Sequence, residues 1–284
     1  MSSVVSLQYD HKQATTGTSM QLALTESLGF MDDIPDAEWK YMKAIARGME
    51  DNFGEEENVK PNVWYQNNWE PTISCRFQRR IGGMGDGPKW ICDPHRIAKA
   101  VQRRGDDKCL VYSIGSRGNF LFEAGLQEFL GNGSICEVHT FDFDDYNKEA
   151  EQHANLNIHY HQWGLKGSYN DTVLSLNQAE FLKENPFKTL QETMQVLGHS
   201  GRVIDIFKID CDGCEWSTYK DWLTVDIRQI QVELHGVPSN KNQLFVDLKR
   251  AGYAVFSKEP NTLGCGGRCI EYAFLKLDPK FAGQ

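Results

Sequence analysis

Three carboxylates lie in the short segment Asp210–Glu215 (DCDGCE), directly after Arg202–Ile209 (RVIDIFKI). That segment is rich in β-branched and aromatic residues and predicts a strand, so the carboxylates stand at its carboxyl end. Three such groups cannot all be buried and paired without a large desolvation cost. At least one is therefore expected to face a cleft, a bound cation or a substrate, which makes this segment the first candidate for a functional site.

A second polar pair stands at the end of the next predicted strand, Ile227–Leu234 (IRQIQVEL). Glu233 and His235 are two residues apart, a spacing that puts both side chains on the same side of a strand. An imidazole changes charge near neutral pH, so His235 is a candidate general base or hydrogen-bond partner of a substrate. The predicted catalytic residues are Asp210, Asp212, Glu233 and His235.

Glycines follow another buried run, in Gly115-Ser116-Arg117-Gly118-Asn119. Glycine lets the backbone approach a ligand closely, and a helix that starts here offers unpaired N–H groups. A tight turn between strand and helix explains the same residues without a ligand.

Two further residues suit an adenosine. Asp142 follows the next strand and can accept hydrogen bonds from ribose hydroxyls, whereas the adjacent Asp144 and Asp145 suit the start of a helix. Trp163 can set an aromatic edge against an adenine ring, although a lone Trp is also a common core residue.

Strands and helices alternate after Pro94, which predicts a parallel sheet with crossover helices. The predicted strands are Cys109–Ile114, Ser134–Phe141, Asn157–His161, Arg202–Ile209, Ile227–Leu234, Tyr253–Ser257 and Cys269–Leu277. The predicted helices are Asn119–Leu130, Asp144–Ala154, Pro186–Leu197, Trp216–Leu223 and Asn240–Ala251. In such a sheet, ligands bind beyond the carboxyl ends of the strands where the strand order reverses, so the candidate residues are expected to meet there.

The predicted organisation has three parts. Residues 1–33 show no sustained period and are interpreted as a mobile arm. Residues 34–95 hold a helix that starts at Asp36 and ends at the acidic run 55–57, then a glycine-rich strap or lid around residues 82–87, beside which Arg80 and Trp90 are candidate substrate contacts. Residues 96–284 form the domain that contains the sheet.

Composition narrows the class of protein. The chain has 284 residues, 40% of them hydrophobic and 24% charged, as in an ordinary globular protein. The formal net charge of −9 repels phosphate backbones, so no nucleic-acid partner is expected. The sequence shows no secretory signal and no apolar run long enough for a membrane span. We expect a cytoplasmic protein, or a soluble lumenal domain if a signal or anchor is missing from the sequence; its oligomeric state is left open.

The eight cysteines are too sparse for a disulfide scaffold and are interpreted as mostly reduced thiols. A four-thiolate zinc site at Cys211, Cys214, Cys265 and Cys269 has imperfect spacing, so no metal site is predicted. Disulfides Cys265–Cys269 or Cys75–Cys92 stay possible in a lumenal protein. His159 and His161 share a strand face, but without a third ligand they are taken as ordinary polar residues.

The segments YSIGSRGNFLFE, HTFDFD, FKIDCDGCEW and QVELH occur in this order and together resemble class I S-adenosylmethionine-dependent methyltransferases. They are most similar to the methyltransferase type 22 family and more distantly to FkbM-type enzymes with their KIDVEG signature. The upstream EPTISCRFQRRIGGMGDGPKWICDPHRI and the final EYAFLKL extend the resemblance from Trp69 to Leu277. It implies a Rossmann-like fold with a mostly parallel seven-stranded sheet, helices on both faces and an N-terminal extension.

The resemblance also implies roles for residues. Gly115, Ser116 and Gly118 would line the methionine part of S-adenosyl-L-methionine, Asp142 would hold its ribose, and Asp210 would lie near the sulfonium. The expected cofactor-binding residues are thus Gly115, Ser116, Gly118, Asp142, Trp163 and Asp210. Glu215, Trp90 and Arg80 are the expected substrate contacts. Asp212 departs from the FkbM signature, which has the longer glutamate there.

The expected function is methyl transfer to a hydroxyl or amine of a small molecule or sugar in an acidic pocket at the strand ends. Two alternatives are a catalytically inactive binding module and a protein methyltransferase. A nicotinamide dehydrogenase is disfavoured, because the first loop reads Gly-Ser-Arg-Gly and lacks the dinucleotide-binding pattern.

Overall fold

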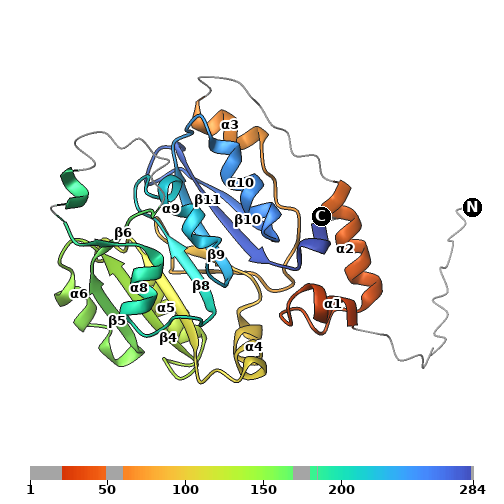
Figure 1. Ribbon diagram of the computed structural model, residues 1–284, viewed down its shortest axis with the longest axis horizontal. Coiled ribbons are helices and arrows are strands. Elements are labelled where there is room, and N and C mark those ends of the chain that lie inside the picture. Colours follow the sequence, from red (N-terminus) through yellow and green to blue (C-terminus); the bar gives the residue numbers. More distant parts are fainter. Residues whose placement is uncertain (1–20, 49–59, 169–179, 184, 283–284) are drawn as a thin grey trace, which may run out of the picture.

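Seven strands form one sheet at the centre of the computed structural model, which describes residues 21–48, 60–168, 180–183 and 185–282 (Figure 1). The strands are β3 (Cys109–Ile114), β4 (Cys136–Asp142), β5 (Ile158–Gln162), β8 (Ile204–Ile209), β9 (Ile227–His235), β10 (Tyr253–Asn261) and β11 (Cys269–Lys276). Their order in the sheet is β10-β11-β9-β8-β3-β4-β5. β11 runs antiparallel to both of its neighbours, and the other neighbouring pairs are parallel. This confirms the predicted Rossmann-like fold with a mostly parallel sheet.

Strand β3 shows why these segments become central strands. Every residue from Cys109 to Ile114 is buried, as expected of a strand covered by helices on both faces. Val111 belongs to the apolar core on one side of the sheet, whereas Tyr112 belongs to the core on the other. Alternate residues of a strand point to opposite faces, so one apolar run fills both cores.

Helices cover both faces of the sheet. They are α1 (Gln21–Glu26), α2 (Asp36–Gly48), α3 (Pro61–Asn67), α4 (Ile97–Arg104), α5 (Leu121–Phe129), α6 (Asn147–Glu151), α8 (Leu190–Val196), α9 (Glu215–Trp222) and α10 (Lys241–Arg250). The core that contains Val111 includes Ile97 of α4 and Leu126 of α5, and the core that contains Tyr112 includes Trp222 of α9 and Leu244 of α10. Among the described residues, no helix is both long and apolar enough to cross a membrane.

Residues 21–33 differ from the mobile arm expected there. They form the short helix α1 and a turn whose Phe30 and Met31 are buried in the core. Trp39 of α2 packs against them and donates a hydrogen bond from Nε1 to Glu26 Oε2 at 2.6 Å. A six-residue helix is too short to show a period, so the sequence pattern could not reveal it. Residues 1–20 and the acidic run 55–57 lie outside the described residues.

The segment expected to be irregular holds a small hairpin, β1 (Arg79–Ile81) with β2 (Lys89–Ile91), joined by the glycine-rich loop 82–87. The hairpin is fastened to the main sheet at Gln229 of β9. This buried amide accepts a hydrogen bond from the Cys92 N–H at 2.8 Å and donates one to the Cys92 carbonyl at 2.9 Å. Both backbone groups of Cys92 are thus satisfied by one side chain.

One helix starts later than expected. Phe187–Lys188 (β7) pairs in parallel with β6 (Gly164–Leu165), and α8 begins only at Leu190. Thr189 caps α8, because its hydroxyl accepts from the Glu192 N–H while the Glu192 carboxylate accepts from the Thr189 N–H. This capping box fixes the start of α8 at Leu190, whereas the apolar period alone placed the start at Pro186.

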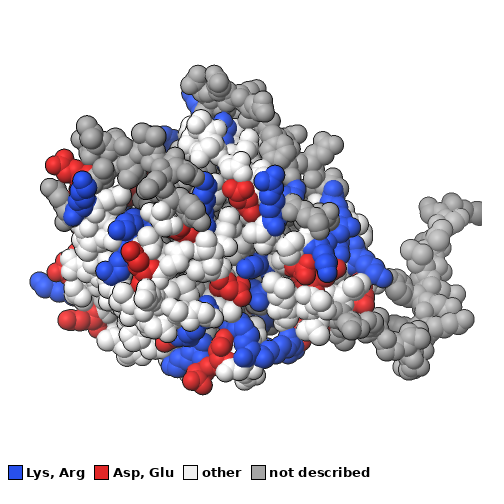
Figure 2. Space-filling model, viewed as in Figure 1, with Lys and Arg blue, Asp and Glu red and all other residues white. Residues whose placement is uncertain are grey.

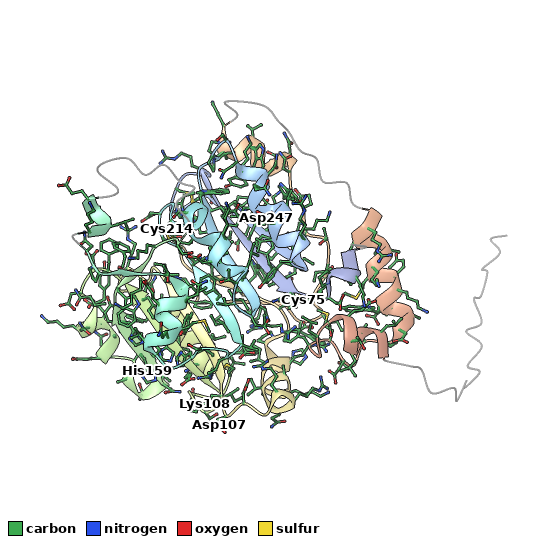
Figure 3. All side chains as sticks on the ribbon, viewed as in Figure 1. Cys75, Asp107, Lys108, His159, Cys214 and Asp247 are labelled. Atoms are coloured by element: carbon green, nitrogen blue, oxygen red, sulfur yellow. A yellow bond between two sulfur atoms is a disulfide. The ribbon has the colours of Figure 1, made fainter. Side chains whose placement is uncertain are left out.

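The prediction of mostly reduced thiols is wrong. Four disulfides join Cys75–Cys92, Cys109–Cys136, Cys211–Cys214 and Cys265–Cys269, and none of the eight cysteines is free. Figure 3 labels one member of two of these pairs, Cys75 and Cys214. The fold places each pair with Cα atoms 4.5 to 5.9 Å apart, which suits a disulfide. Cysteine density could not reveal these distances, and the pairing leaves no four-thiolate zinc site.

The strand order reverses between β3 and β8, where Gly115 meets Asp210. Gly115 has φ +76°, and a Cβ built on it would lie 1.6 Å from the Asp210 carbonyl oxygen. Only glycine fits this contact between the two strand ends.

We therefore expect Gly115→Ala to destabilise the fold more than Gly198→Ala. Gly198 has a similar φ of +72° but open space around its Cβ position, so its substitution costs backbone strain of about 1–2 kcal/mol. Gly115→Ala adds a steric clash, worth about 1–3 kcal/mol more. The free energies of unfolding come from urea denaturation, and equal losses in the two variants would contradict the steric argument.

Candidate active site

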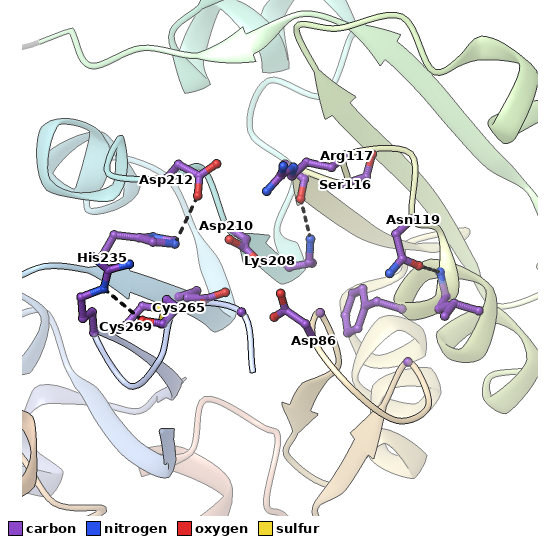
Figure 4. Close-up of a pocket in the computed structure, with 18 of the residues that line it drawn as sticks. Asp86, Ser116, Arg117, Asn119, Lys208, Asp210, Asp212, His235, Cys265 and Cys269 are labelled. Carbon is purple, nitrogen blue, oxygen red and sulfur yellow. Dashed lines mark hydrogen bonds and ion pairs between the residues drawn. A yellow bond between two sulfur atoms is a disulfide. The ribbon is translucent and has the colours of Figure 1, made fainter. Parts of the chain in front are cut away.

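A cavity of about 650 Å³ opens beyond the carboxyl ends of β3, β8 and β9 (Figure 4). Its wall includes Gly82, Asp86, Gly87, Gly115, Ser116, Arg117, Asn119, Lys208, Asp210, Asp212, Glu233, His235, Cys265, Arg268 and Cys269. The volume lies within the range of small-molecule and cofactor sites, roughly 300–1,000 Å³. The predicted residues of β3, β8 and β9 therefore do come together at the strand ends.

The loop after β3 is held from two sides. Lys208 of β8 donates from Nζ to the Gly115 carbonyl at 3.1 Å, and Asp142 at the end of β4 accepts from the Arg117 N–H at 2.9 Å. Arg117 itself has φ +48°, a left-handed conformation that costs energy for a residue with a side chain. These two contacts fix the backbone of the loop beside the cavity.

Three of the predicted cofactor residues lie outside the cavity wall. Asp142 is buried behind the loop, and Gly118 packs against Tyr146. Trp163 donates from its indole to the Thr193 hydroxyl at 3.3 Å and carries the Lys188 ammonium 5.0 Å from its ring centroid. The structure thus brings Gly115, Ser116 and Asp210 to the cavity, whereas Trp163 packs beside the sheet.

A buried lysine that sequence reasoning missed lies under the carboxylates. Lys89 Nζ is 2.6 Å from Glu271 Oε1, 3.3 Å from Asp210 Oδ2 and 3.9 Å from Glu233 Oε2, and its side chain is 1% exposed. Burial alone would lower the pKa of Lys89, but the charges of Glu271 and Asp210 outweigh burial and raise it above its ordinary value. The expected acidic pocket therefore contains a fixed cation supplied by the hairpin.

Asp210 and Glu233 differ in protonation. Burial would raise the pKa of Asp210, but Lys89 and Lys208 hold it below its usual range. Burial, followed by the negative charge of Asp210, raises the pKa of Glu233 to about 8, and the two carboxyl groups share a hydrogen bond. Asp210 is thus ionised at neutral pH while Glu233 is protonated, a division of roles typical of paired active-site carboxyls.

His235 lies between two carboxylates. Its Nδ1 is 2.8 Å from Glu215 Oε1 and its Nε2 is 3.5 Å from Asp212 Oδ1, the contact drawn in Figure 4. Burial would lower the pKa of His235, but the hydrogen bond and charge of Glu215 raise it to about 9. Glu215, expected to contact substrate, is fully buried behind His235, because the first turn of α9 points it into the fold.

Arg80 and Trp90, the other expected substrate contacts, also lie outside the cavity wall. Both bind Glu259 Oε2, Arg80 through Nε at 3.0 Å and Trp90 through Nε1 at 2.8 Å. Arg80 also donates to the carbonyls of Gly83 and Gly85, each at 3.2 Å. These side chains hold the glycine-rich loop from behind, while Gly82, Asp86 and Gly87 of the loop face the cavity.

The sequence patterns assigned no site role to Lys208, Asp86, Asn119 and Arg268, all of which line the cavity. Lys208 stands inside a segment already singled out, two residues before Asp210 on the same strand face, so period-two alternation could have found it. Lys89 gave no such signal, because its partners come from β8, β9 and β11, far away in the sequence.

Residues 21–276 match the family described as a methyltransferase domain, type 22. No curated protein is similar enough to the chain to count as a match.

Similar solved structures include an rRNA methylase from Streptococcus thermophilus, with 10% identity, 61% of this chain and 89% of that chain covered, and a TM-score of 0.36. A putative RNA methyltransferase from Pyrococcus horikoshii has 11% identity, coverages of 84% and 98%, and a TM-score of 0.30. A human methyltransferase 10 domain containing protein has 13% identity, coverages of 86% and 98%, and a TM-score of 0.30.

The expectation that nucleic acid is not a partner is wrong as an exclusion. Two of these similar structures are described as an rRNA methylase and a putative RNA methyltransferase. The net charge of −9 is a sum over the whole chain, whereas Figure 2 shows acidic and basic side chains next to one another on one face. The net charge therefore does not decide the class of acceptor.

Removal of the Lys89 charge is expected to destabilise the protein strongly. Lys89→Met leaves the carboxyls of Asp210, Glu233 and Glu271 buried without their cation, a loss of about 3–5 kcal/mol. Lys99→Met is the control, because Lys99 forms an ion pair with Asp32 but is 56% exposed, and should cost no more than about 1 kcal/mol. Urea denaturation measures both, and similar small losses would contradict the central role of Lys89.

His235 should titrate well above an ordinary histidine. The pKa of His235 in the folded protein, about 9, exceeds the ordinary histidine value of 6.5. Its charged form therefore stabilises the fold fully below about pH 6.5, and this stabilisation is lost as the pH rises through about 9. Glu215→Gln should lower the pKa measured by NMR, because the carboxylate charge is gone. Asp212→Asn should lower it less, since Asp212 is 72% exposed. An unchanged pKa in Glu215→Gln would contradict this assignment.

Proposed function

This chain belongs to the methyltransferase domain family, type 22, and from that premise we propose that its strand-end cavity transfers a methyl group from S-adenosyl-L-methionine to a hydroxyl or amine. The observation that carries the proposal is the convergence of the Gly115 loop, the ionised Asp210 and the Glu215–His235 pair on one cavity. They lie at the carboxyl ends of three neighbouring strands, with Glu215 in the first turn of α9, next to the point where the strand order reverses, where open α/β sheets bind ligands.

The residues present fit the proposed cofactor. S-adenosyl-L-methionine, when bound, supplies a methyl group already activated on a positively charged sulfonium. Gly115 and Ser116 present a wall without bulky side chains, and the ionised Asp210 places negative charge beside it. A cavity of about 650 Å³ leaves room for a ligand of cofactor size.

Asp142 is the proposed partner of the ribose. Its Oδ2 accepts from the Arg117 N–H, and its Oδ1 accepts a long hydrogen bond from the Asp144 N–H at 3.3 Å. An ionised carboxylate has about four acceptor positions, so two are not used by these contacts. Asp142 is 5% exposed behind the loop, so ribose hydroxyls would reach it once the adjoining loop moves aside. Asp142 would then couple the bound ribose to the loop that lines the methionine end of the cavity.

His235 is the proposed base for the acceptor. Glu215 accepts the Nδ1–H, which leaves Nε2 on the cavity side to take a proton from a hydroxyl or ammonium. The pKa of about 9 keeps the ring protonated in the free protein. A cation bound in the cavity disfavours a second positive charge nearby, and so lowers the pKa of His235 toward neutrality.

The glycine-rich loop is proposed to close the cavity on the acceptor side. Asp86 accepts from Asn261 Nδ2 at 2.7 Å, and the same amide donates to Glu233 Oε1 at 2.8 Å. Arg80 holds the loop carbonyls from the other side. This double anchoring lets the loop exclude water from the reacting groups while four glycines permit a small adjustment.

Calorimetry with S-adenosyl-L-methionine and its demethylated product tests the cofactor site. Asp142→Asn should weaken binding at least tenfold, because the amide cannot accept hydrogen bonds with the strength of a carboxylate. Asp144→Asn is the control, since Asp144 is exposed two residues away, and its binding should equal that of the wild type. Wild-type affinity in Asp142→Asn would contradict the ribose assignment.

Formation of the demethylated product over a panel of acceptors tests the reaction itself. The panel includes RNA, proteins and small hydroxyl and amine compounds. With any active acceptor, His235→Gln should lower kcat at least a hundredfold, the loss of a positioned base, with cofactor affinity kept within twofold. Unchanged turnover in His235→Gln would contradict its role as base, and absence of cofactor binding in the wild type would contradict the proposed function.

A further inference from the structure

Four histidine rings gather outside the active-site cavity. Their rings come from β4, β5 and the turn after α8, and none of them lines the cavity. The set comprises His139, His159, His161 and His199. The His139 ring stacks on those of His159 and His161 at centroid distances of 5.0 and 5.2 Å, and meets His199 edge-on at 4.7 Å. Figure 3 labels His159.

One nitrogen in this group has no partner. His139 is 7% exposed, and its Nε2 is buried without a hydrogen bond in the structure. Nε2 points toward Glu137, whose Oε2 is 4.0 Å away, and potential ligand atoms of Glu137, His139 and His199 all lie within 4.8 Å of one another. An unpaired buried polar atom costs about 1–3 kcal/mol, so it calls for a partner.

The Nδ1 atoms of His139 and His199 each have a hydrogen-bond partner, as in histidines that bind metals. His139 Nδ1 is 2.9 Å from His161 Nε2, and His199 Nδ1 is 2.7 Å from the Tyr112 hydroxyl. When each Nδ1 carries the hydrogen and donates it, both Nε2 atoms keep a lone pair. Ligand histidines generally donate the second ring N–H in this way, which fixes their orientation.

Glu137 completes a donor set of two imidazoles and one carboxylate. Its Oε1 pairs with Arg202, so Oε2 is left for the histidine side. Its side chain is 22% exposed, which opens a path from solvent to the otherwise buried nitrogens. All eight cysteines are in disulfides, so thiolates do not compete for a metal.

We propose that Glu137, His139 and His199 bind one zinc ion, with water as a fourth ligand. Two histidines, one carboxylate and a water form a common tetrahedral zinc set. Around such an ion the ligand atoms lie about 3.3 Å apart. The candidate ligand atoms of the three residues already lie within 4.8 Å of one another, so small side-chain movements would bring them to this spacing. The ion would tie β4 to the turn between α8 and β8. This site is independent of methyl transfer.

The proposed set differs from the pair noticed in the sequence. His159 and His161 share a strand face, but here His161 supports His139 from behind, and the exposed His159 contacts the Asn157 side chain at 3.0 Å. His199 lies far along the chain, and the fold alone brings it to β4. His161 and Tyr112 are therefore positioning residues for the two ligand histidines.

Calorimetric titration of the full chain with zinc chloride tests the site. The protein is freed of any affinity tag, treated with chelator, desalted and kept without reductant so that the disulfides persist. The wild type should bind one zinc ion per chain. His199→Ala and Glu137→Gln should each weaken binding at least tenfold, and His159→Ala, the matched control, should bind as the wild type does.

Tyr112→Phe separates a positioned site from a loose cluster of imidazoles. It keeps the packed ring but removes the hydroxyl that orients His199, so zinc affinity should fall about 10- to 100-fold. Circular dichroism verifies that each variant is folded, and zinc should raise the Tm of the wild type but not of Glu137→Gln. No saturable binding in the wild type, or wild-type affinity in both His199→Ala and Glu137→Gln, would overturn the proposal.

Discussion

The buried ammonium of Lys89 is the interaction on which the active-site region depends. Strand pairing puts Glu233 of β9 directly opposite Glu271 of β11, and β8 delivers Asp210 to the same place. Burial raises the pKa of Glu233 and of Glu271, whereas Lys89 and Lys208 hold the pKa of Asp210 below its usual range. Lys89 lies within 4.0 Å of all three carboxyls and so supplies the cation that offsets the negative charge buried among them. The β1–β2 hairpin that carries Lys89 is therefore part of what stabilises this end of the sheet.

This dependence explains why the hairpin is fastened so firmly. Gln229 holds the backbone of Cys92, and Cys92 is joined to Cys75. Both contacts lie next to β2, so they fix the strand from which Lys89 reaches under the carboxyls. The N-terminal extension thus forms part of the wall of the site, and the glycine-rich loop that it carries reaches the cavity at Asp86.

The sequence was sufficient where the pattern is local. β3 has the predicted bounds, because Cys109–Ile114 is apolar except for Ser113 and is bounded by Lys108 and Gly115. Ligands of parallel sheets bind beyond the carboxyl ends of the strands, and this rule correctly predicted that Gly115, Asp210 and His235 line one cavity. The sequence was insufficient where the partner of a residue is distant along the chain. No local pattern predicts the ion pairs of Lys89 with its three carboxyls or the disulfides between strands. Glu215 was misplaced because the first turn of α9 decides whether it faces solvent or core.

The buried polar groups around Lys89 and those around His139 are stabilised in different ways. Around Lys89 the chain supplies its own cation, so the acceptor atoms of the three carboxyls have a permanent positive partner. Around His139 the Nδ1–H groups of His139 and His199 are donated to the His161 ring and to the Tyr112 hydroxyl, and the buried Nε2 lone pair of His139 is left without a partner. Because Arg202 is occupied by Glu137 Oε1, the chain offers no second cation there among the described contacts. The leftover lone pair beside the free carboxylate oxygen is satisfied at least cost by a positive ion from solution.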